Sequence, residues 1–158
     1  MINYLVITKS LINRRRPDFE FTVFNNSPVT PLSKPLNKCK LSIVTTGGIH
    51  LKNDIPFDLS LKDGDCTYRI LPKEISLDEI AVSHKWYNHK FINKDINCVF
   101  PIDRMKEYVQ KGVIHSISEE HLSFMGHIYF TAPLLKQSLK AGRYLKKLGV
   151  DIAFLTPT

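Results

Sequence analysis

The densest group of polar side chains suited to chemistry lies between residues 83 and 104. It contains Ser83, His84, His89, Asp95, Asn97 and Arg104. The imidazole of histidine titrates near physiological pH and can give or take a proton, so these histidines are candidates for proton transfer or substrate binding. They are equally compatible with surface histidines on a long loop. A metal site fits poorly, because His84 and His89 are five residues apart and no H-E-x-x-H motif is present.

A second candidate is the segment Thr46-Gly47-Gly48-Ile49-His50, which directly follows an apolar run at residues 41–45. Paired glycines let the backbone turn tightly and approach a ligand or another loop closely, with N–H groups available to an anion. The segment has neither the dinucleotide-binding nor the Walker spacing. A plain turn and a ligand loop therefore both remain open.

Strands and helices that would position these groups alternate along the chain. Strands are predicted at residues 41–45, 67–72, 113–117, 122–125 and 150–158. Asp103 is expected to cap a helix over residues 104–111, and Ser76 and Glu79 have the spacing of a capping box. This alternation predicts an α/β fold with a mainly parallel sheet between two helical layers, three layers in all.

A second helix is predicted over residues 133–148. Its face toward the core is expected to carry Leu135, Leu139, Leu145 and Leu148. The apolar run that follows, at residues 150–158, is typical of a parallel strand buried on both faces. It is either the last strand of the domain or is followed by a further loop and helix. Chemistry in open α/β sheets gathers beyond the carboxyl ends of such strands.

The composition indicates one globular domain. The chain has 158 residues, of which 43% are hydrophobic and 23% are charged. Residues 1–40 hold Pro28, Pro31 and Pro35, which favour an extended N-terminal arm, and residues 41–158 form the α/β domain. We expect a cytoplasmic protein, because no apolar run reaches the length of a membrane span and no secretory signal is present.

The net charge of +7 is spread along the chain. It is more consistent with a solvated basic surface than with a nucleic-acid site, because no basic-aromatic reader motif is present. The cysteines, Cys39, Cys66 and Cys98, are odd in number and widely spaced, so neither a disulfide framework nor a redox pair is indicated. Whether Cys98 has a redox role stays open.

Several segments, in order, resemble the selenoprotein B family of glycine, sarcosine, betaine and D-proline reductases. The block from Asp95 to Arg104 is the most specific. Shorter matches lie at residues 43–52, 64–65, 68–69, 83–84, 124–126 and 149–157. Together they cover residues 30–158, and the short N-terminal arm resembles the D-proline reductase subunit most.

The resemblance implies reductive cleavage of a C–N bond in a glycine-, betaine- or D-proline-like substrate. In this family a pyruvoyl group on a partner subunit condenses with the substrate amine. A selenocysteine, or a cysteine replacing it, then attacks the α-carbon. In the family, that residue follows a strand resembling residues 150–158, so we expect the selenocysteine beyond Thr158. Its absence from this sequence is explained by a UGA codon read as a stop, by a truncated sequence, or by a homologue that lacks the redox residue.

The resemblance also assigns candidate roles. His50 and His84 are expected to handle protons or contact a carboxylate, and Gly47 and Gly48 to allow close approach. Asp95, Asn97 and Arg104 are expected to orient the substrate, although Arg104 is equally suited to an ion pair with Asp95 or Asp103. The chain itself carries no cofactor and no nucleophile. A non-catalytic α/β binding or scaffolding homologue is therefore the alternative, and a homo-oligomer is compatible with either.

Overall fold

The computed structural model describes residues 4–15, 17–21, 25–26, 29–85 and 87–158. The chain divides into two compact units, Met1–Pro31 and Leu32–Thr158. In the first unit, helix α1 (Tyr4–Asn13) occupies part of the segment for which an extended arm was predicted. Part of that segment, including Pro28, falls outside the described residues.

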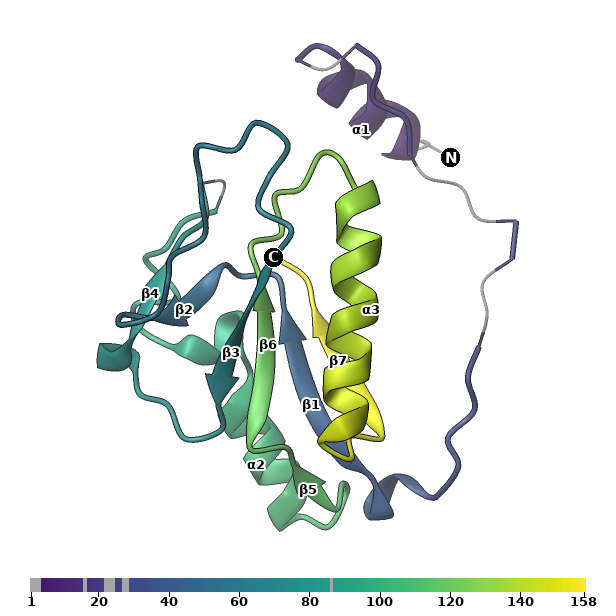
Figure 1. Cartoon of the computed structure of the whole chain (residues 1–158), viewed down its shortest axis with the longest axis vertical. Coiled ribbons are helices and arrows are strands. Elements are labelled where there is room, and N and C mark those ends of the chain that lie inside the picture. The colour runs from purple at the N-terminus through teal and green to yellow at the C-terminus, as the bar shows by residue number, and fades with distance from the viewer. Residues whose placement is uncertain (1–3, 16, 22–24, 27–28, 86) are drawn as a thin grey trace. The chain divides into compact units, whose positions relative to one another are not determined.

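The second unit contains a five-stranded, mainly parallel sheet (Figure 1). Its strands are β1 (Lys40–Thr45), β3 (Tyr68–Pro72), β5 (Ser116–Ile117), β6 (Glu120–Phe124) and β7 (Ile152–Thr156). Strand β1 pairs in parallel with β5, β6 and β7, whereas β3 pairs antiparallel with β6. Leu41 pairs with both β5 and β7, and Val44 pairs with both β6 and β7. Strands β5 and β6 therefore lie along one edge of β1, and β7 lies along the other edge. The prediction of an α/β fold with a mainly parallel sheet is confirmed.

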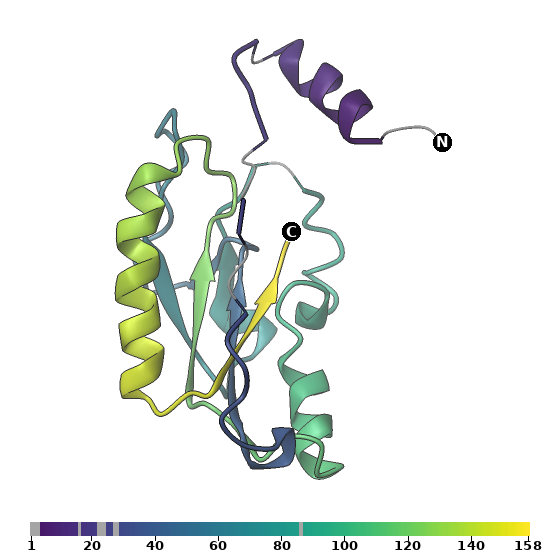
Figure 2. The ribbon, with the colours of Figure 1, turned by 90° about the vertical axis from the view of Figure 1, so that its right-hand side faces the viewer.

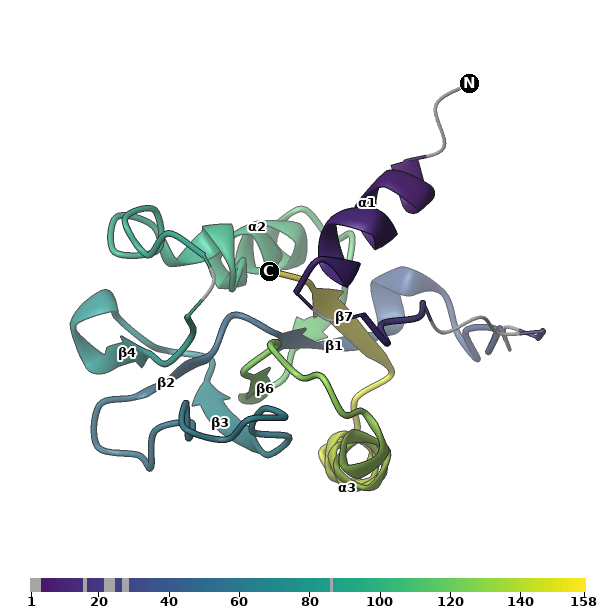
Figure 3. The same ribbon diagram turned by 90° about the horizontal axis from the view of Figure 1, so that it is seen from above.

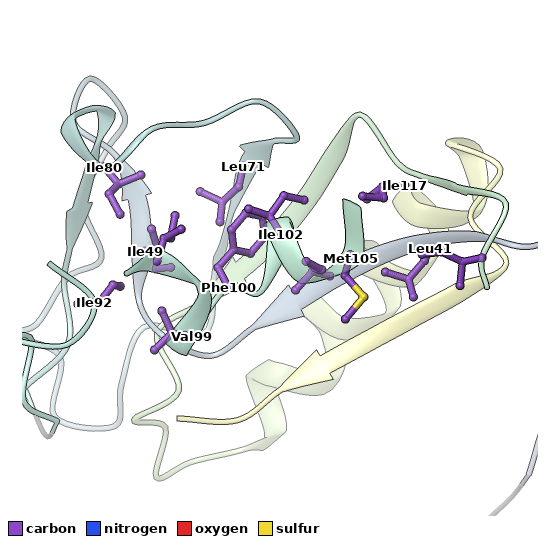
Figure 4. Close-up of a cluster of buried hydrophobic side chains, with 13 residues drawn as sticks. Leu41, Ile49, Leu71, Ile80, Ile92, Val99, Phe100, Ile102, Met105 and Ile117 are labelled. Atoms are coloured by element: carbon purple, nitrogen blue, oxygen red, sulfur yellow. The ribbon is translucent and has the colours of Figure 1, made fainter. Parts of the chain in front are cut away.

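Two helices cover opposite faces of this sheet (Figure 3). Helix α2 (Ile102–Gln110) packs Ile102 and Met105 into the larger hydrophobic cluster, whose buried centre includes Phe100 and Ile43 (Figure 4). Helix α3 (Ala132–Lys147) packs Ala141 and Leu145 against Leu122 and Phe124 on the other face. The sheet therefore separates two clusters, which fix the positions of the strand ends.

A small second sheet pairs β2 (Ile49–Leu51) antiparallel with β4 (Ile80–Val82). Three short 3₁₀ turns join the elements: η1 (Leu36–Lys38), η2 (Leu77–Glu79) and η3 (Ile96–Cys98). The capping box predicted for Ser76 and Glu79 is present, because the Ser76 backbone N–H donates to the Glu79 carboxylate at 2.8 Å. None of the described helices is long and apolar enough to cross a membrane.

Three details of the predicted elements are wrong. Pro101, not Asp103, precedes the first turn of α2. The strand expected from residue 113 is shortened to Ser116–Ile117, because the N–H groups of Val113 and Ile114 bond to the Tyr108 carbonyl at the end of α2. On α3, Leu135 and Leu139 are 68% and 64% exposed, so only part of the predicted apolar face is buried.

The C-terminal strand also differs from the prediction. It pairs in parallel with β1 as expected, but it is not buried on both faces: Ala153, Phe154 and Leu155 are all exposed. Strand β7 lies at an edge of the described sheet, where β1 is the one described strand that pairs with it (Figure 2). Of its apolar side chains, Ile152 packs against the larger hydrophobic cluster, whereas the other three lack the cover that the sequence pattern predicted.

Candidate functional site

The parallel strands β1, β6 and β7 end at one edge of the sheet, and the loops that follow them are hydrogen-bonded to one another. Thr46 donates its N–H to the Thr156 carbonyl at 3.1 Å, and Gly48 donates to the Phe124 carbonyl at 2.9 Å. Thr158 donates its N–H to the Thr46 hydroxyl at 3.0 Å. We call these three loop segments, at residues 46–48, 125–127 and 156–158, the carboxyl edge. Ligand sites of open α/β sheets lie in this position.

Gly47 and Gly48 allow other segments to approach this edge closely. Gly48 has φ +66°, and a Cβ placed there would lie 2.6 Å from the Ser83 carbonyl oxygen. A Cβ at Gly47 would lie 3.1 Å from Cβ of Val99. Both backbone N–H groups already donate within the fold, that of Gly47 to the Thr45 hydroxyl at 3.0 Å. The loop thus brings Ser83 and His84 onto the carboxyl edge and does not present these two N–H groups to an anion.

Replacing Gly48 with alanine is expected to lower the free energy of unfolding by about 1–3 kcal/mol, because an L-residue is strained at this φ and its Cβ meets backbone atoms. Gly142 is the matched control, because an added Cβ there meets no atom within 4 Å and it lies inside helix α3. Gly142→Ala should raise stability by up to about 1 kcal/mol. Urea unfolding of the two variants measures both effects, and equal stability of Gly48→Ala and wild type would contradict the close approach.

His50 is buried, and both of its ring nitrogens have partners. Nδ1 lies 2.8 Å from the Leu51 carbonyl and Nε2 lies 2.9 Å from the Ser83 hydroxyl. A carbonyl can only accept, so Nδ1 carries a proton, and in the neutral ring Nε2 accepts from Ser83. The ring also packs edge-on against Phe57. This geometry suits His50 to holding Ser83, and with it the neighbouring His84, in place.

His84 lies among other aromatic rings at the carboxyl edge. Its ring centroid is 4.8 Å from Tyr87 and 6.4 Å from His127, and His127 in turn lies 4.4 Å from Tyr129. Burial lowers the pKa of His84, and the nearby His127 and His89 lower it further. The ring is therefore predominantly neutral at pH 7.

Tyr87 connects this aromatic group to the glycine loop. Its hydroxyl donates to the Gly47 carbonyl at 2.7 Å, and burial raises its pKa to about 12, so the phenol stays protonated. The sequence did not single out Tyr87 or His127 as site residues. Their only sequence signals are position: Tyr87 lies within the polar group, and His127 follows a predicted strand.

Asp95, Asn97 and Asp103 form an exposed hydrogen-bond network where η3 meets α2. The Asp95 carboxylate accepts from the Asn97 N–H at 2.9 Å and from the Asn97 side-chain amide at 2.8 Å. The same amide donates to Asp103 at 2.8 Å. Hydrogen bonds from the Asn97 side chain and backbone lower the pKa of Asp95. Arg104 forms an ion pair with Glu107 at 2.7 Å, rather than with either aspartate.

This network is linked to the carboxyl edge through Val99. The Val99 carbonyl accepts from the hydroxyls of Thr45 and Thr156, at 2.7 and 2.9 Å. Asp95 and Asn97 therefore fix the turn that supports the strand ends. Partial burial and the nearby Asp95 carboxylate raise the pKa of the Cys98 thiol, which disfavours the thiolate needed for redox chemistry.

In the described part of the chain, no cluster of three or more His, Cys, Asp or Glu side chains could hold a metal ion. The described cysteines are all free: Cys39 is buried, Cys66 half-buried and Cys98 exposed. The polar groups of the carboxyl edge are thus hydroxyls, imidazoles and a phenol. They are suited to binding a small polar substrate and moving protons.

The fold defines the chain as an α/β protein with a mainly parallel sheet, a class in which ligand sites commonly lie beyond the carboxyl ends of the strands. It matches the family described as glycine/sarcosine/betaine reductase selenoprotein B over residues 5–158. The chain belongs to this family, and the resemblance noted from the sequence is confirmed. No solved structure shows a significant similarity to it.

Three curated relatives are subunits of amino-acid reductases. The chain is 37% identical over 131 residues to D-proline reductase subunit gamma of Acetoanaerobium sticklandii, covering 80% of this chain and 52% of the relative. It is 31% identical to sarcosine reductase complex component B subunit beta of Peptoclostridium acidaminophilum, over 69% of this chain and 26% of the relative. It is 28% identical to glycine reductase complex component B subunit gamma of Carboxydothermus hydrogenoformans, over 85% of this chain and 32% of the relative. The chain thus spans between a quarter and about half of these relatives.

Proposed function

We propose that this chain is part of a reductase complex that reductively cleaves the C–N bond of a D-proline-like amino acid, and that the carboxyl edge handles the substrate. Family membership and the 37% identity to a D-proline reductase subunit support this assignment. The identities to glycine and sarcosine reductase subunits are 28% and 31%, which favours a cyclic secondary amine over glycine or sarcosine.

One observation carries the proposal: a buried imidazole with a lowered pKa lies at the carboxyl edge, against the glycine loop. Amino-acid substrates enter as ammonium ions, whose nitrogen has no lone pair. Neutral His84 accepts a proton from this ammonium group and leaves an amine able to condense with a carbonyl. The resulting imidazolium can return the proton to nitrogen when the C–N bond breaks.

The other predicted residues support His84. His50 holds the Ser83 hydroxyl, and Gly48 allows the Ser83–His84 backbone to reach the strand ends. Asp95 and Asn97 orient the edge through the turn before Val99, and Arg104 lies on the exposed surface of α2. Apart from Arg104, which pairs with Glu107, these residues have positioning roles, because each acts through another side chain or through the backbone.

Within the family, a selenol would supply the nucleophile and a pyruvoyl group on a partner subunit would supply the carbonyl that takes the amine. The described residues fit such chemistry, because a neutral imidazole can take a proton from the substrate's ammonium group and the Tyr87 phenol stays protonated. The chain's own contribution is to bind the substrate, orient it and move its proton.

The experiment is to purify the native reductase that contains this chain and incubate it with D-proline, glycine, sarcosine or betaine and a dithiol reductant. We expect reductive ring opening of D-proline, measured as the C–N-cleaved amino acid, to proceed faster than cleavage of the other three. Preference for another substrate of the panel would overturn the D-proline assignment. No cleavage of any of them would favour a non-catalytic binding homologue.

A further inference from the structure

The side of helix α3 that points away from the sheet carries apolar side chains. Within the second unit, α3 is the outermost element on its side of the sheet (Figure 3). Leu135 and Leu139 are both largely exposed. Leu139 lies about 160° around the helix axis from the buried Ala141, so it points to solvent. Two leucines one helical turn apart therefore form a small apolar strip that the described part of the chain leaves uncovered.

Gly142 provides open space beside this strip. It follows Leu139 by three residues, so the two are neighbours on the helix surface. A Cβ added at Gly142 would meet no atom within 4 Å, so no described residue requires a glycine here. Glycine inside a helix costs about 1 kcal/mol of stability relative to alanine. A helix surface without a side chain lets another segment approach the backbone closely.

Positive charges border the strip, and no negative charge on the helix balances them. Helix α3 carries five basic residues and no acidic one. All five are exposed, and the ion pairs formed among the described residues include none of them. The five cations are Lys136, Lys140, Arg143, Lys146 and Lys147. We call these cations, together with Leu135, Leu139 and Gly142, the outer face of α3.

The spacing of the cations is unfavourable for a helix that faces only water. Lys136 and Lys140 are four residues apart, as are Arg143 and Lys147. Like charges at this spacing destabilise a helix by about 0.2–0.5 kcal/mol per pair, whereas a glutamate in either place would give an attractive pair. Carboxylates supplied from outside the helix would relieve this repulsion. The outer face of α3 is therefore complementary to an acidic surface.

We propose that the outer face of α3 binds an acidic protein surface on another subunit of the reductase complex. The partner's carboxylates lie against the cations, and an apolar side chain of the partner fills the space beside Gly142 and the two leucines. An apolar centre with a polar rim is the usual anatomy of a protein–protein interface. Insertion into a membrane is disfavoured because the face offers only two leucines. A single-stranded nucleic acid is disfavoured because the face offers no aromatic side chain for stacking.

The inference rests on the proposed function, because that proposal places the chain in a multi-subunit reductase. It does not depend on the substrate or on the role of His84, and assembly is measured without turnover. A reductase that cleaves D-proline but assembles independently of α3 would overturn this inference alone. A complex that assembles through α3 but cleaves none of the substrates would overturn the proposed activity alone.

The first test reverses two charges in the native reductase, purified through a tag on this chain. Lys140→Glu/Arg143→Glu should lower the recovery of a partner subunit at least about tenfold, because both replacements repel the partner's carboxylates. Recovery with the wild-type chain should fall as salt is raised from about 0.1 to 0.5 M.

The matched control is Lys62→Glu/Lys111→Glu, which makes the same change in net charge at exposed lysines outside α3. It should leave recovery of the partner unchanged. Circular dichroism establishes that both double variants are folded. Equal recovery of the partner with the two double variants would overturn the proposal.

The second test identifies the chemistry of the occupant by zero-length cross-linking of the native reductase with a carbodiimide, which joins a lysine to a carboxylate in contact with it. Mass spectrometry should find Lys136 or Lys140 joined to an Asp or Glu of another subunit. Replacing that carboxylate by lysine should restore recovery of the partner with Lys140→Glu/Arg143→Glu.

Three results would assign the outer face of α3 to a different occupant and overturn the proposal. One is cross-linking to a second copy of this chain. The others are salt-sensitive binding of the 158-residue chain to duplex DNA or RNA, or to phosphatidylglycerol vesicles, that Lys140→Glu/Arg143→Glu abolishes and the control retains.

Discussion

Replacing His84 with glutamine in the native reductase is expected to lower kcat for C–N cleavage by about 10²–10⁴-fold, the range typical of losing a general base. Glutamine keeps hydrogen-bonding groups at the site but cannot accept a proton. The wild-type reductase should also lose kcat/KM as the pH falls through the lowered pKa of His84, because only the neutral imidazole can take the ammonium proton. This acidic limb should be absent in the variant.

The control for His84 is His115→Gln, which changes an exposed histidine before β5, outside the carboxyl edge. It should retain wild-type kcat and the same pH profile. Circular dichroism and urea unfolding establish that both variants are folded. If His84→Gln is folded, keeps wild-type kcat and still shows the acidic limb, His84 is not the base.

Acidification from pH 6.5 to 4 is expected to remove about 3 kcal/mol of stability through His121 alone. This histidine is fully buried on β6, and its Nδ1 accepts from the Ile43 N–H at 3.0 Å. Its Nε2 has no hydrogen-bond partner among the described residues. Burial lowers the pKa of His121 to about 4, because protonation would place a charge in the core and remove the acceptor for Ile43.

The direction of this change in the free energy of unfolding follows from proton uptake. Between pH 6.5 and 4 the unfolded chain binds a proton at His121 that the folded chain does not, so stability is complete above pH 6.5 and is lost as the pH falls toward 4. Urea unfolding across this range measures the loss. In His121→Asn, the side-chain oxygen can still accept from the Ile43 N–H, but the side chain does not titrate. The variant should therefore lose the pH dependence of stability that His121 causes, whereas the contribution of the other titrating groups should be the same in both proteins. The same pH dependence in both proteins would show that His121 does not titrate in this range.

Most strands of the sheet could be predicted because their apolar runs reflect burial within this chain. The run at residues 41–45 is β1, paired on both sides. The run at residues 150–158 has the same apolar character, but most side chains of the strand it forms are exposed. The sequence pattern indicates that such a strand needs a covering layer, but it does not indicate which segment supplies that layer. Val113 and Ile114 are apolar because they complete the end of α2, and not because they pair in the sheet.

The candidate site was predictable in residue type but not in role. His50 and His84 carry the same side chain, and only the structure shows that Leu51 and Ser83 occupy both nitrogens of His50. His121 was missed because the alternation of Glu120 to Phe124 resembles a strand with one face in solvent, whereas His121 and Ser123 are both buried. Such partners come from distant segments, which local spacing does not reveal.

The most direct measurement is the location of the substrate in a cryo-electron microscopy map of the native reductase, with a non-cleavable cyclic amino acid bound. We predict that its amine nitrogen lies within hydrogen-bonding reach of the His84 ring, about 3 Å, beside the strand ends at Thr46 and Thr156. Density for the amino acid elsewhere, such as the cavity of about 330 Å³ lined by Lys73, Lys106 and Glu119, would contradict a substrate site at the carboxyl edge.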